Sequence, residues 1–388
     1  MISPIFLDYA ATAAVRPEPV VEAVAAYLRD IGATPGRGGY GRAVEAGRVA
    51  LRCRLALAAF LEIPGDPGRI VFQLNATHAL NTALRGLLAP GDRVVRTEYD
   101  HNAVRRPLAA LAERGVVEAV VRGRPDGSVD LDELDALVAG AGERPARLLV
   151  LPHVSNVLGS VLPVRAMVEI AHRHGALVLL DAAQSVGHLP VSVGELGVDL
   201  LAFSGHKGLL GPQGTGALWV REDVDVAPLL SGGTGADSLP PEMPASYPDH
   251  LEAGTQNGPG IAGLLAGVEW LRERGVESQH GREVALKHEL RRGLETIPGV
   301  RVRSPASPEG TGIVTITVDG VTSAEVARRL DRDFGILVRA GLHCAPDAHR
   351  VLGTLETGAV RFSIGWATTR EEIGRAVEAV RELVGGER

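Results

Sequence analysis

Short apolar runs alternate with helical patterns in the first half of the chain. The runs are continuous in valine, leucine and isoleucine, which is typical of strands covered on both faces of a sheet. We expect strands at residues 70–72, 93–96, 116–121, 148–151, 177–180 and 200–203, with helices at 76–87, 103–113, 131–138 and 164–174. This order of elements predicts an α/β fold with a mostly parallel sheet between layers of helices.

The pattern changes toward the C-terminus. Two long helical stretches lead into single strands and helices, at residues 261–272, 276–297, 314–318, 323–334, 336–339, 360–364 and 370–383. We interpret residues 256–388, joined by residues 1–16, as a smaller α+β domain. Residues 17–255 then form a large α/β domain.

Three segments near the N-terminus carry further expectations. A helix is expected from residue 17 to 28. Residues 32–41 contain five glycines and a proline, so we expect a mobile lid over a site. From residue 44 to 61 apolar residues recur at helical spacing, and we expect Cys53 within this pattern to be an inert core cysteine.

Polar side chains follow five of the predicted strands. Ligands of such sheets bind beyond the carboxyl ends of the strands, so these side chains are candidates for a common site. They include Asn75 and Thr77, Asp100 and His101, His153 and Asn156, Asp181 and Gln184, and Ser204, His206 and Lys207.

Lysine is nearly absent from this chain. Of the 40 lysine and arginine residues, only Lys207 and Lys287 are lysines. A partly desolvated lysine can lose its proton and form an imine with a carbonyl, whereas arginine stays protonated. We therefore interpret Lys207 as a Schiff-base lysine, with a charged strand terminus as the alternative. Lys287 lies in a helical pattern with charges on one side, and we expect it on a solvated face.

The residues around Lys207 fit pyridoxal phosphate as the carbonyl partner. Asp181 is placed to keep the pyridine nitrogen protonated, with a helix N-cap as its alternative role. Ala76 and Thr77 at a helix start would bind the phosphate through backbone N–H groups, with added donors from the strand end at 204–206.

Eight motifs occur in order along almost the whole chain. They are LDYAAT, NATHALN, DHN, HVSNVLG, DAAQS, SGHKGLLGPQG, EAGTQN and RAGLHCA. With these motifs the sequence resembles the class V, fold-type I pyridoxal-phosphate enzymes of the cysteine desulfurase and selenocysteine lyase family. The resemblance implies a seven-stranded sheet and a homodimer.

The resemblance also implies roles for individual residues. Lys207 would hold the cofactor covalently, and Asp181 would contact its pyridine nitrogen. The other implied cofactor contacts are Gln184 near the phenolic oxygen, His101 stacked on the ring, Asn156 on cofactor and substrate, Ala76, Thr77, Ser204 and His206 at the phosphate, and Thr255 at the phosphate of the neighbouring subunit. Tyr40 and Leu342 depart from residues common in the family, and either could alter substrate preference.

Cys344 distinguishes between the possible activities. It lies in an irregular stretch between Arg339 and Pro346, next to His343, where a thiolate would be stabilised; an inert cysteine is the alternative. The family implies that Lys207 removes the Cα proton of L-cysteine. Cys344 then takes the sulfur as a persulfide and alanine leaves.

Substrate binding and sulfur delivery follow from the same resemblance. Arg361 matches the position that binds the substrate carboxylate, with Arg339 as the alternative. The short loop around Cys344 resembles the branch that hands sulfur to a docked protein acceptor. A selenocysteine lyase, or another C–S lyase acting on a cysteine derivative, is the alternative enzyme, with Cys344 incidental. A non-enzymatic scaffold is disfavoured because Lys207 and Asp181 are both present.

Composition narrows the setting. The net charge of −7 argues against nucleic acid or an acidic membrane as a partner. No apolar run in the sequence is long enough to span a membrane, and no leader pattern precedes Leu7. Cys53 and Cys344 form neither a disulfide framework nor a metal cluster, so we expect a reducing, cytoplasmic location and no metal.

Overall fold

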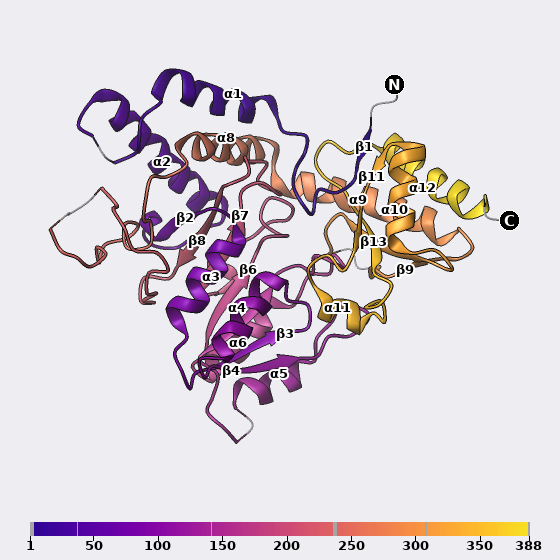
Figure 1. Cartoon of the computed structure of the whole chain (residues 1–388), viewed down its shortest axis with the longest axis horizontal. Helices are drawn as coiled ribbons and strands as arrows, with labels where there is room; N and C mark the ends of the chain where they lie inside the picture. Colours follow the sequence, from indigo (N-terminus) through magenta and orange to yellow (C-terminus); the bar gives the residue numbers. More distant parts are fainter. Residues whose placement is uncertain (1–3, 37, 141, 236–238, 307–308, 387–388) are drawn as a thin grey trace.

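The computed structural model describes residues 4–36, 38–140, 142–235, 239–306 and 309–386. A seven-stranded sheet forms its centre (Figure 1). The strands lie in the order β2 (Ile70–Gln73), β8 (Gly216–Val220), β7 (Leu200–Ser204), β6 (Leu177–Asp181), β5 (Leu148–Pro152), β3 (Arg93–Thr97) and β4 (Val117–Val121). Only β8 runs antiparallel to its neighbours in this sheet, so the predicted mostly parallel sheet is confirmed.

Helices cover both faces of this sheet. Successive residues of β6 point to opposite faces, and Leu179 and Leu180 accordingly belong to two separate buried clusters. The cluster around Leu180 includes side chains of α2 (Gly41–Phe60), α5 (Leu131–Val138), α6 (Val164–Arg173) and α8 (Gly258–Arg274). The cluster around Leu179 includes side chains of α3 (Ala76–Leu87) and α4 (Asn102–Ala112). Burial on both faces is why these strands contain continuous apolar runs.

A second, four-stranded antiparallel sheet lies to the right in Figure 1. Its order is β12 (Arg339–Gly341), β13 (Ala359–Ser363), β10 (Ile313–Val318) and β9 (Val300–Val302). Its core includes side chains of α9 (Val276–Glu295), α10 (Ser323–Phe334) and α12 (Arg370–Gly385). The N-terminal β1 (Ile5–Phe6) pairs in parallel with β11 (Ile336–Leu337), which places the start of the chain beside this sheet.

Several predicted boundaries differ from the structure. The strand expected at residues 336–339 is two strands, because β11 pairs with β1 while β12 pairs with β13 in the other sheet. The helix expected at 17–28 is α1 (Glu18–Ala26), which continues as a π-helical turn at Tyr27–Ile31. Elements without a prediction are β1, β8, β9, a 3-10 turn at Pro67–Arg69, α7 (Val193–Leu196) and α11 (Pro346–Val351).

The expectation of a solvated Lys287 is wrong. Lys287 is fully buried on α9, in one stripe with Glu283, Leu290 and Leu294. Burial lowers the pKa of Lys287 to about 8. The helical spacing correctly predicted which residues share a face of the helix. That face is buried against the rest of the protein and is not exposed to water.

Two other expectations concern the N-terminal part of the chain. Cys53 is completely buried in α2, as expected for a core cysteine, and burial raises its pKa to about 12.

The lid at residues 32–41 stays a prediction, and Arg37 within it lies outside the described residues. Among the described helices, none combines the length and the apolar character that crossing a bilayer requires.

A buried ion pair ties α2 to the strand β2. Arg54 contacts both carboxylate oxygens of Glu252, at 2.6 and 2.8 Å, and donates to the carbonyl of Ile70 at 3.0 Å. Glu252 in turn accepts the backbone N–H of Phe72 at 2.6 Å. Removing one member of such a pair leaves the other charge buried without compensation.

We therefore predict that Arg54→Ala lowers the free energy of unfolding by about 3–5 kcal/mol, the cost of stranding a buried charge. The control is Arg52→Ala, two residues along α2, whose exposed side chain lies 3.3 Å from Glu269. That change should leave the free energy nearly unchanged because exposed ion pairs contribute little. Urea unfolding followed by circular dichroism checks both, and equal small losses would contradict the role given to Arg54.

Candidate active site

The carboxyl ends of β2, β3, β5, β6 and β7 open on one cavity of about 190 Å³. Strands that run in the same direction end at the same edge of a sheet, which brings side chains distant in sequence together. The lining includes nine of the residues predicted to contact a cofactor, namely Ala76, Thr77, His101, Asn156, Asp181, Gln184, Ser204, His206 and Lys207.

Lys207 and Asp181 form the electrostatic centre of this cavity. Burial lowers the pKa of Lys207 to about 8, although the nearby Asp181 carboxylate acts in the opposite direction. Burial raises the pKa of Asp181, against the hydrogen bond from the Ala183 N–H at 3.0 Å and the charge of Lys207. An amine with this pKa is partly neutral near physiological pH and can act as nucleophile and base.

The start of α3 provides a site for an anion. Asn75 caps this helix by accepting the N–H of His78 at 3.0 Å, and Ser204 Oγ accepts the N–H of Ala76 at 3.0 Å. Thr77 follows in the first helical turn and lines the cavity. The N–H groups of a first turn and the helix dipole favour a phosphate or carboxylate.

His101 is held in one tautomer. Its Nδ1 accepts the N–H of Ala103 at 3.0 Å and so caps α4, which leaves the proton on Nε2. Burial, followed by the charge of Lys207, lowers the pKa of His101 to about 4. The ring in the cavity is therefore a neutral imidazole with an Nε2–H donor at physiological pH.

Two amide side chains connect the cavity to distant parts of the chain. Gln184 Nε2 donates to the carbonyl of Ala10 at 2.9 Å, and Asn156 Nδ2 donates to the carbonyl of His343 at 2.7 Å. His206 lies near the same N-terminal segment, with Nδ1 3.1 Å from the hydroxyl of Thr12.

Arg361 on β13 is almost completely buried beside the cavity. It forms an ion pair with Asp8 at 2.8 Å and donates to the carbonyl of Asn156 at 2.9 Å. Its Nε is buried without a hydrogen-bond partner among the described residues. A buried donor left in this state is a candidate contact for a ligand anion.

Cys344 is partly exposed and does not line the Lys207 cavity, but its turn is hydrogen-bonded to Asn156, which does. His343 and Cys344 both adopt left-handed backbone conformations, with φ of 50° and 58°. The guanidinium Nη2 of Arg339 is 4.0 Å from Cys344 Sγ, and the Cys344 carbonyl accepts the N–H of Asn102 at 2.7 Å. A cationic donor therefore lies beside the sulfur atom.

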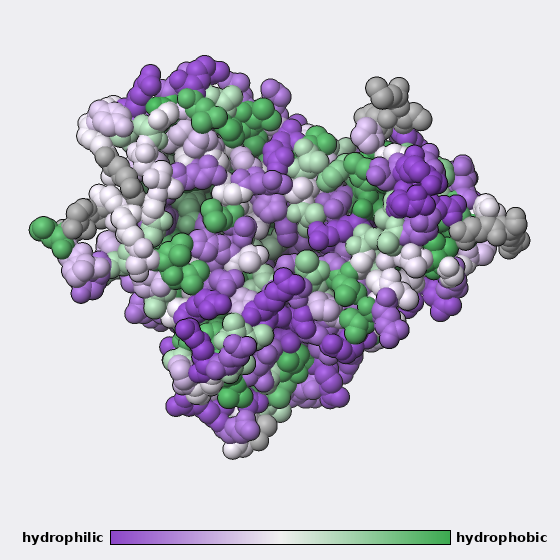
Figure 2. Space-filling view, viewed as in Figure 1, coloured by the Kyte–Doolittle hydropathy of each residue, from purple (hydrophilic) through white to green (hydrophobic). Residues whose placement is uncertain are grey.

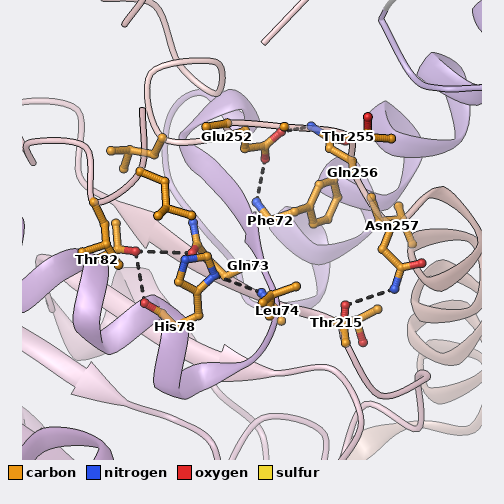
Figure 3. Close-up of a pocket in the computed structure, with 18 residues that line it drawn as sticks. Phe72, Gln73, Leu74, His78, Thr82, Thr215, Glu252, Thr255, Gln256 and Asn257 are labelled. Carbon is orange, nitrogen blue, oxygen red and sulfur yellow. Dashed lines mark hydrogen bonds between the residues drawn. The ribbon is translucent and has the colours of Figure 1, made fainter. Parts of the chain in front are cut away.

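Thr255 is the one predicted cofactor residue that does not line this cavity. It borders a second pocket, together with Phe72, His78 and Asn257 (Figure 3). Within one chain the structure therefore separates Thr255 from the other nine residues. Its predicted contact with a neighbouring subunit's cofactor stays a prediction.

The family model for class-V aminotransferases matches residues 5–375. The chain belongs to the class-V aminotransferase family. A probable cysteine desulfurase of Methanothermobacter thermautotrophicus is 37% identical over 388 residues, covering 98% of this chain and 95% of the relative.

Solved structures resemble this class-V chain over nearly its whole length. The apo structure of a cysteine desulfurase from Thermococcus onnurineus NA1 has a TM-score of 0.90 at 32% identity, covering 99% of this chain and 95% of the other. A cysteine desulfurase of Escherichia coli, in an S-sulfonic acid form, has a TM-score of 0.87 at 28% identity, covering 98% and 95%.

Several residues of this class-V site carried no prediction. Asp8 pairs with Arg361, Thr12 contacts His206, and His349 contacts His343. Asp8 and Thr12 belong to the LDYAAT motif, so the motif could have marked them as site residues. The neighbouring sequence, however, does not indicate which residues they contact. Tyr40 precedes α2 with its side chain 61% exposed, so it does not enter the Lys207 cavity.

The coupling of Lys207 to Asp181 leads to a pH prediction. The Asp181 carboxylate raises the pKa of Lys207, so Asp181→Asn should move that pKa below about 8. Labelling of Lys207 by an amine reagent, on protein stripped of bound cofactor, should then begin at lower pH. Mass spectrometry of the Lys207 peptide measures the midpoint. The control Asp135→Asn removes an exposed carboxylate paired with Arg173 and should not move it; an unmoved midpoint in Asp181→Asn would contradict the coupling.

Proposed function

We propose that the protein is a pyridoxal-phosphate-dependent cysteine desulfurase. It converts L-cysteine to L-alanine and takes the sulfur as a persulfide on Cys344. The observation that supports this best is that Arg339, whose Nη2 lies 4.0 Å from Cys344 Sγ, is among the charges that help lower the pKa of Lys207 to about 8. Relatives of full length carry the name cysteine desulfurase, which supports the same function.

The cavity residues fit the cofactor. Lys207 would bind it covalently and Asp181 would lie at its pyridine nitrogen. Thr77, Ser204 and His206 surround the start of α3, where a phosphate is favoured. When bound, pyridoxal phosphate supplies an electron sink for the negative charge that develops at the substrate Cα.

Substrate orientation falls to Arg361. Its unpartnered Nε and the guanidinium held by Asp8 and Asn156 present a fixed cation to the substrate carboxylate. Because both partners hold the guanidinium in place, little side-chain freedom is lost when a carboxylate binds. Arg339 is the alternative ligand, but its contact with Cys344 Sγ favours a role at the sulfur.

Proton transfer and sulfur transfer involve two different residues. The neutral amine of Lys207 accepts the Cα proton, and the neutral His101 donates its Nε2–H toward the cavity without competing for that proton. The Cys344 thiolate attacks the substrate sulfur. An S–S bond forms as the C–S bond breaks, and the electron pair stays on the three-carbon product, which is protonated to alanine.

Delivery of the sulfur requires access to Cys344. Because Cys344 is partly exposed, a persulfide on its sulfur would be accessible to a docked protein acceptor. Both cysteines are free thiols, which fits the reducing cytoplasm as the location.

A homodimer is part of the same proposal. Val44, Leu51 and Leu55 form an exposed apolar stripe along α2, at 42%, 54% and 49% exposure. Hydrophobic side chains also lie over α1 at the top of Figure 2. Such a stripe is typical of a surface that another chain covers. The Thr255 pocket next to α2 would then face a partner.

Cys344→Ser tests the function. Serine is close to cysteine in shape but does not accept sulfur, so cofactor binding should persist. Alanine formation from L-cysteine should fall by about a hundredfold or more, the scale seen when a catalytic nucleophile is removed. Mass spectrometry after one turnover should find the added sulfur on the Cys344 peptide of the wild type.

The matched control is Cys53→Ser, which should keep the activity and lower stability by about 1 kcal/mol through a polar core substitution. If Cys344→Ser turns over L-cysteine at the wild-type rate and the wild type carries no persulfide, the desulfurase proposal fails. A C–S lyase acting on a cysteine derivative, or a selenocysteine lyase, then replaces it.

For the dimer, we predict that the double change Leu51→Glu and Leu55→Glu produces monomers, because it buries carboxylates at the proposed interface. Sedimentation velocity measures the state. Val117→Glu, at an exposed position on β4, serves as the control and should leave a dimer. A wild-type protein that sediments as a fully active monomer would refute the dimer.

A further inference from the structure

A series of hydrogen bonds connects Thr354, His349 and His343, the residue that precedes Cys344. Thr354 Oγ1 is 2.8 Å from His349 Nδ1, His349 Nε2 is 3.1 Å from His343 Nδ1, and His343 Nε2 is 3.3 Å from the carbonyl of Arg339. The two imidazole rings are stacked, with centroids 5.3 Å apart and an interplanar angle of 21°. All three side chains are buried.

Only one arrangement of protons satisfies this series of hydrogen bonds. A carbonyl can only accept, so His343 Nε2 carries a proton and His343 Nδ1 accepts from His349 Nε2–H. His349 Nδ1 must then accept from the Thr354 hydroxyl. Burial lowers the pKa of His343 to about 3 and that of His349 to about 4, so both rings are neutral at physiological pH.

This series of hydrogen bonds ends at two features that determine the position and the surroundings of the Cys344 thiol. One is the left-handed turn formed by His343 and Cys344 themselves, a conformation that costs energy in residues other than glycine and needs support from its surroundings. The other is the carbonyl of Arg339, whose own guanidinium contacts Cys344 Sγ. Asn102 and Asn156 support the turn from the side of the cavity.

None of the three side chains lines the Lys207 cavity. Thr354 instead borders a different hollow, with Gly353 and Thr357. The series of hydrogen bonds therefore runs from the His343–Cys344 turn to a residue that borders this hollow. His343 contacts the predicted cofactor residue Asn156 through its carbonyl. A change is therefore best made at Thr354, at the other end of the series of hydrogen bonds.

We propose that Thr354, His349 and His343 are positioning residues for the sulfur-accepting step, resting on the proposed function. They hold the His343–Cys344 turn in its left-handed form, and through the Arg339 carbonyl they keep the Arg339 guanidinium against Cys344 Sγ. The carbonyl of Arg339, which can only accept, sets the tautomer of both rings, and the Thr354 hydroxyl is the donor that completes the series.

The test uses Thr354→Val, which keeps the shape of the side chain and removes the hydroxyl. In the cofactor-loaded protein, alkylation of Cys344 by iodoacetamide should slow about threefold to tenfold, the effect expected for one hydrogen bond. Persulfide formation in a single turnover should slow by the same factor. Cofactor absorbance and the KM for L-cysteine should stay unchanged, because Lys207 and Arg361 are untouched.

Three variants control the experiment. Thr354→Ser restores a hydroxyl and should recover the wild-type alkylation rate. Thr357→Val removes a nearby hydroxyl that donates to the carbonyl of Gly358 at 3.2 Å, outside the series of hydrogen bonds, and should have no effect. His349→Phe keeps the ring stack, removes both hydrogen bonds and should give the largest loss, with thermal unfolding showing that it is folded.

Wild-type alkylation rates in folded Thr354→Val and His349→Phe would overturn the proposal, as would an equal loss in Thr357→Val. Alkylation needs no turnover of L-cysteine. A wild type that forms no alanine, but whose Cys344 alkylation still depends on Thr354, would therefore refute the desulfurase function and leave the positioning role intact.

Discussion

A partly buried lysine and a buried aspartate at the ends of adjacent strands impose the main constraint on this protein. Asp181 ends β6 and Lys207 follows β7, and the two strands pair in parallel with Asp181 opposite Ala202. Burial favours the neutral form of each group, while each stabilises the charge of the other. These opposing effects act on both groups because the sheet places them at the same edge. His101 is neutral and therefore adds no positive charge beside Lys207.

The rest of the site is assembled from segments far apart in the sequence. Asp8 and Arg361, separated by 353 residues, meet beside the cavity, and the N-terminal strand β1 reaches the same region by pairing with β11. Lys207 would hold the cofactor, Arg361 would orient the substrate, and Cys344 would collect the sulfur. The first comes from the large sheet and the other two from segments near the small sheet, so the reaction depends on the contact between them.

Much of this site was predictable because strand ends of a parallel sheet converge. The continuous apolar run before Ser204 predicted β7, and the scarcity of lysine singled out Lys207. The face that α9 buries was not predictable, since helical spacing shows which residues share a face but not whether another segment covers it; Lys287 was misplaced for that reason. The ion pair of Asp8 with Arg361 depends on long-range packing, for which the local sequence carries no signal. His349 contacts residues only five and six positions away, but those contacts depend on the backbone turn around Cys344, which the sequence analysis treated only as irregular.

The central claim is that Lys207, and not Lys287, carries the cofactor. Lys287 is fully buried and Lys207 is partly buried, and both have a pKa lowered to about 8, so their titration does not distinguish them. Their surroundings do, because only Lys207 lines the cavity with Asp181 and Thr77. Borohydride reduction of the loaded protein, followed by peptide mapping, measures this directly. The account predicts the reduced pyridoxyl group on the Lys207 peptide alone; the group on Lys287, or cofactor retained covalently in Lys207→Ala, would contradict it.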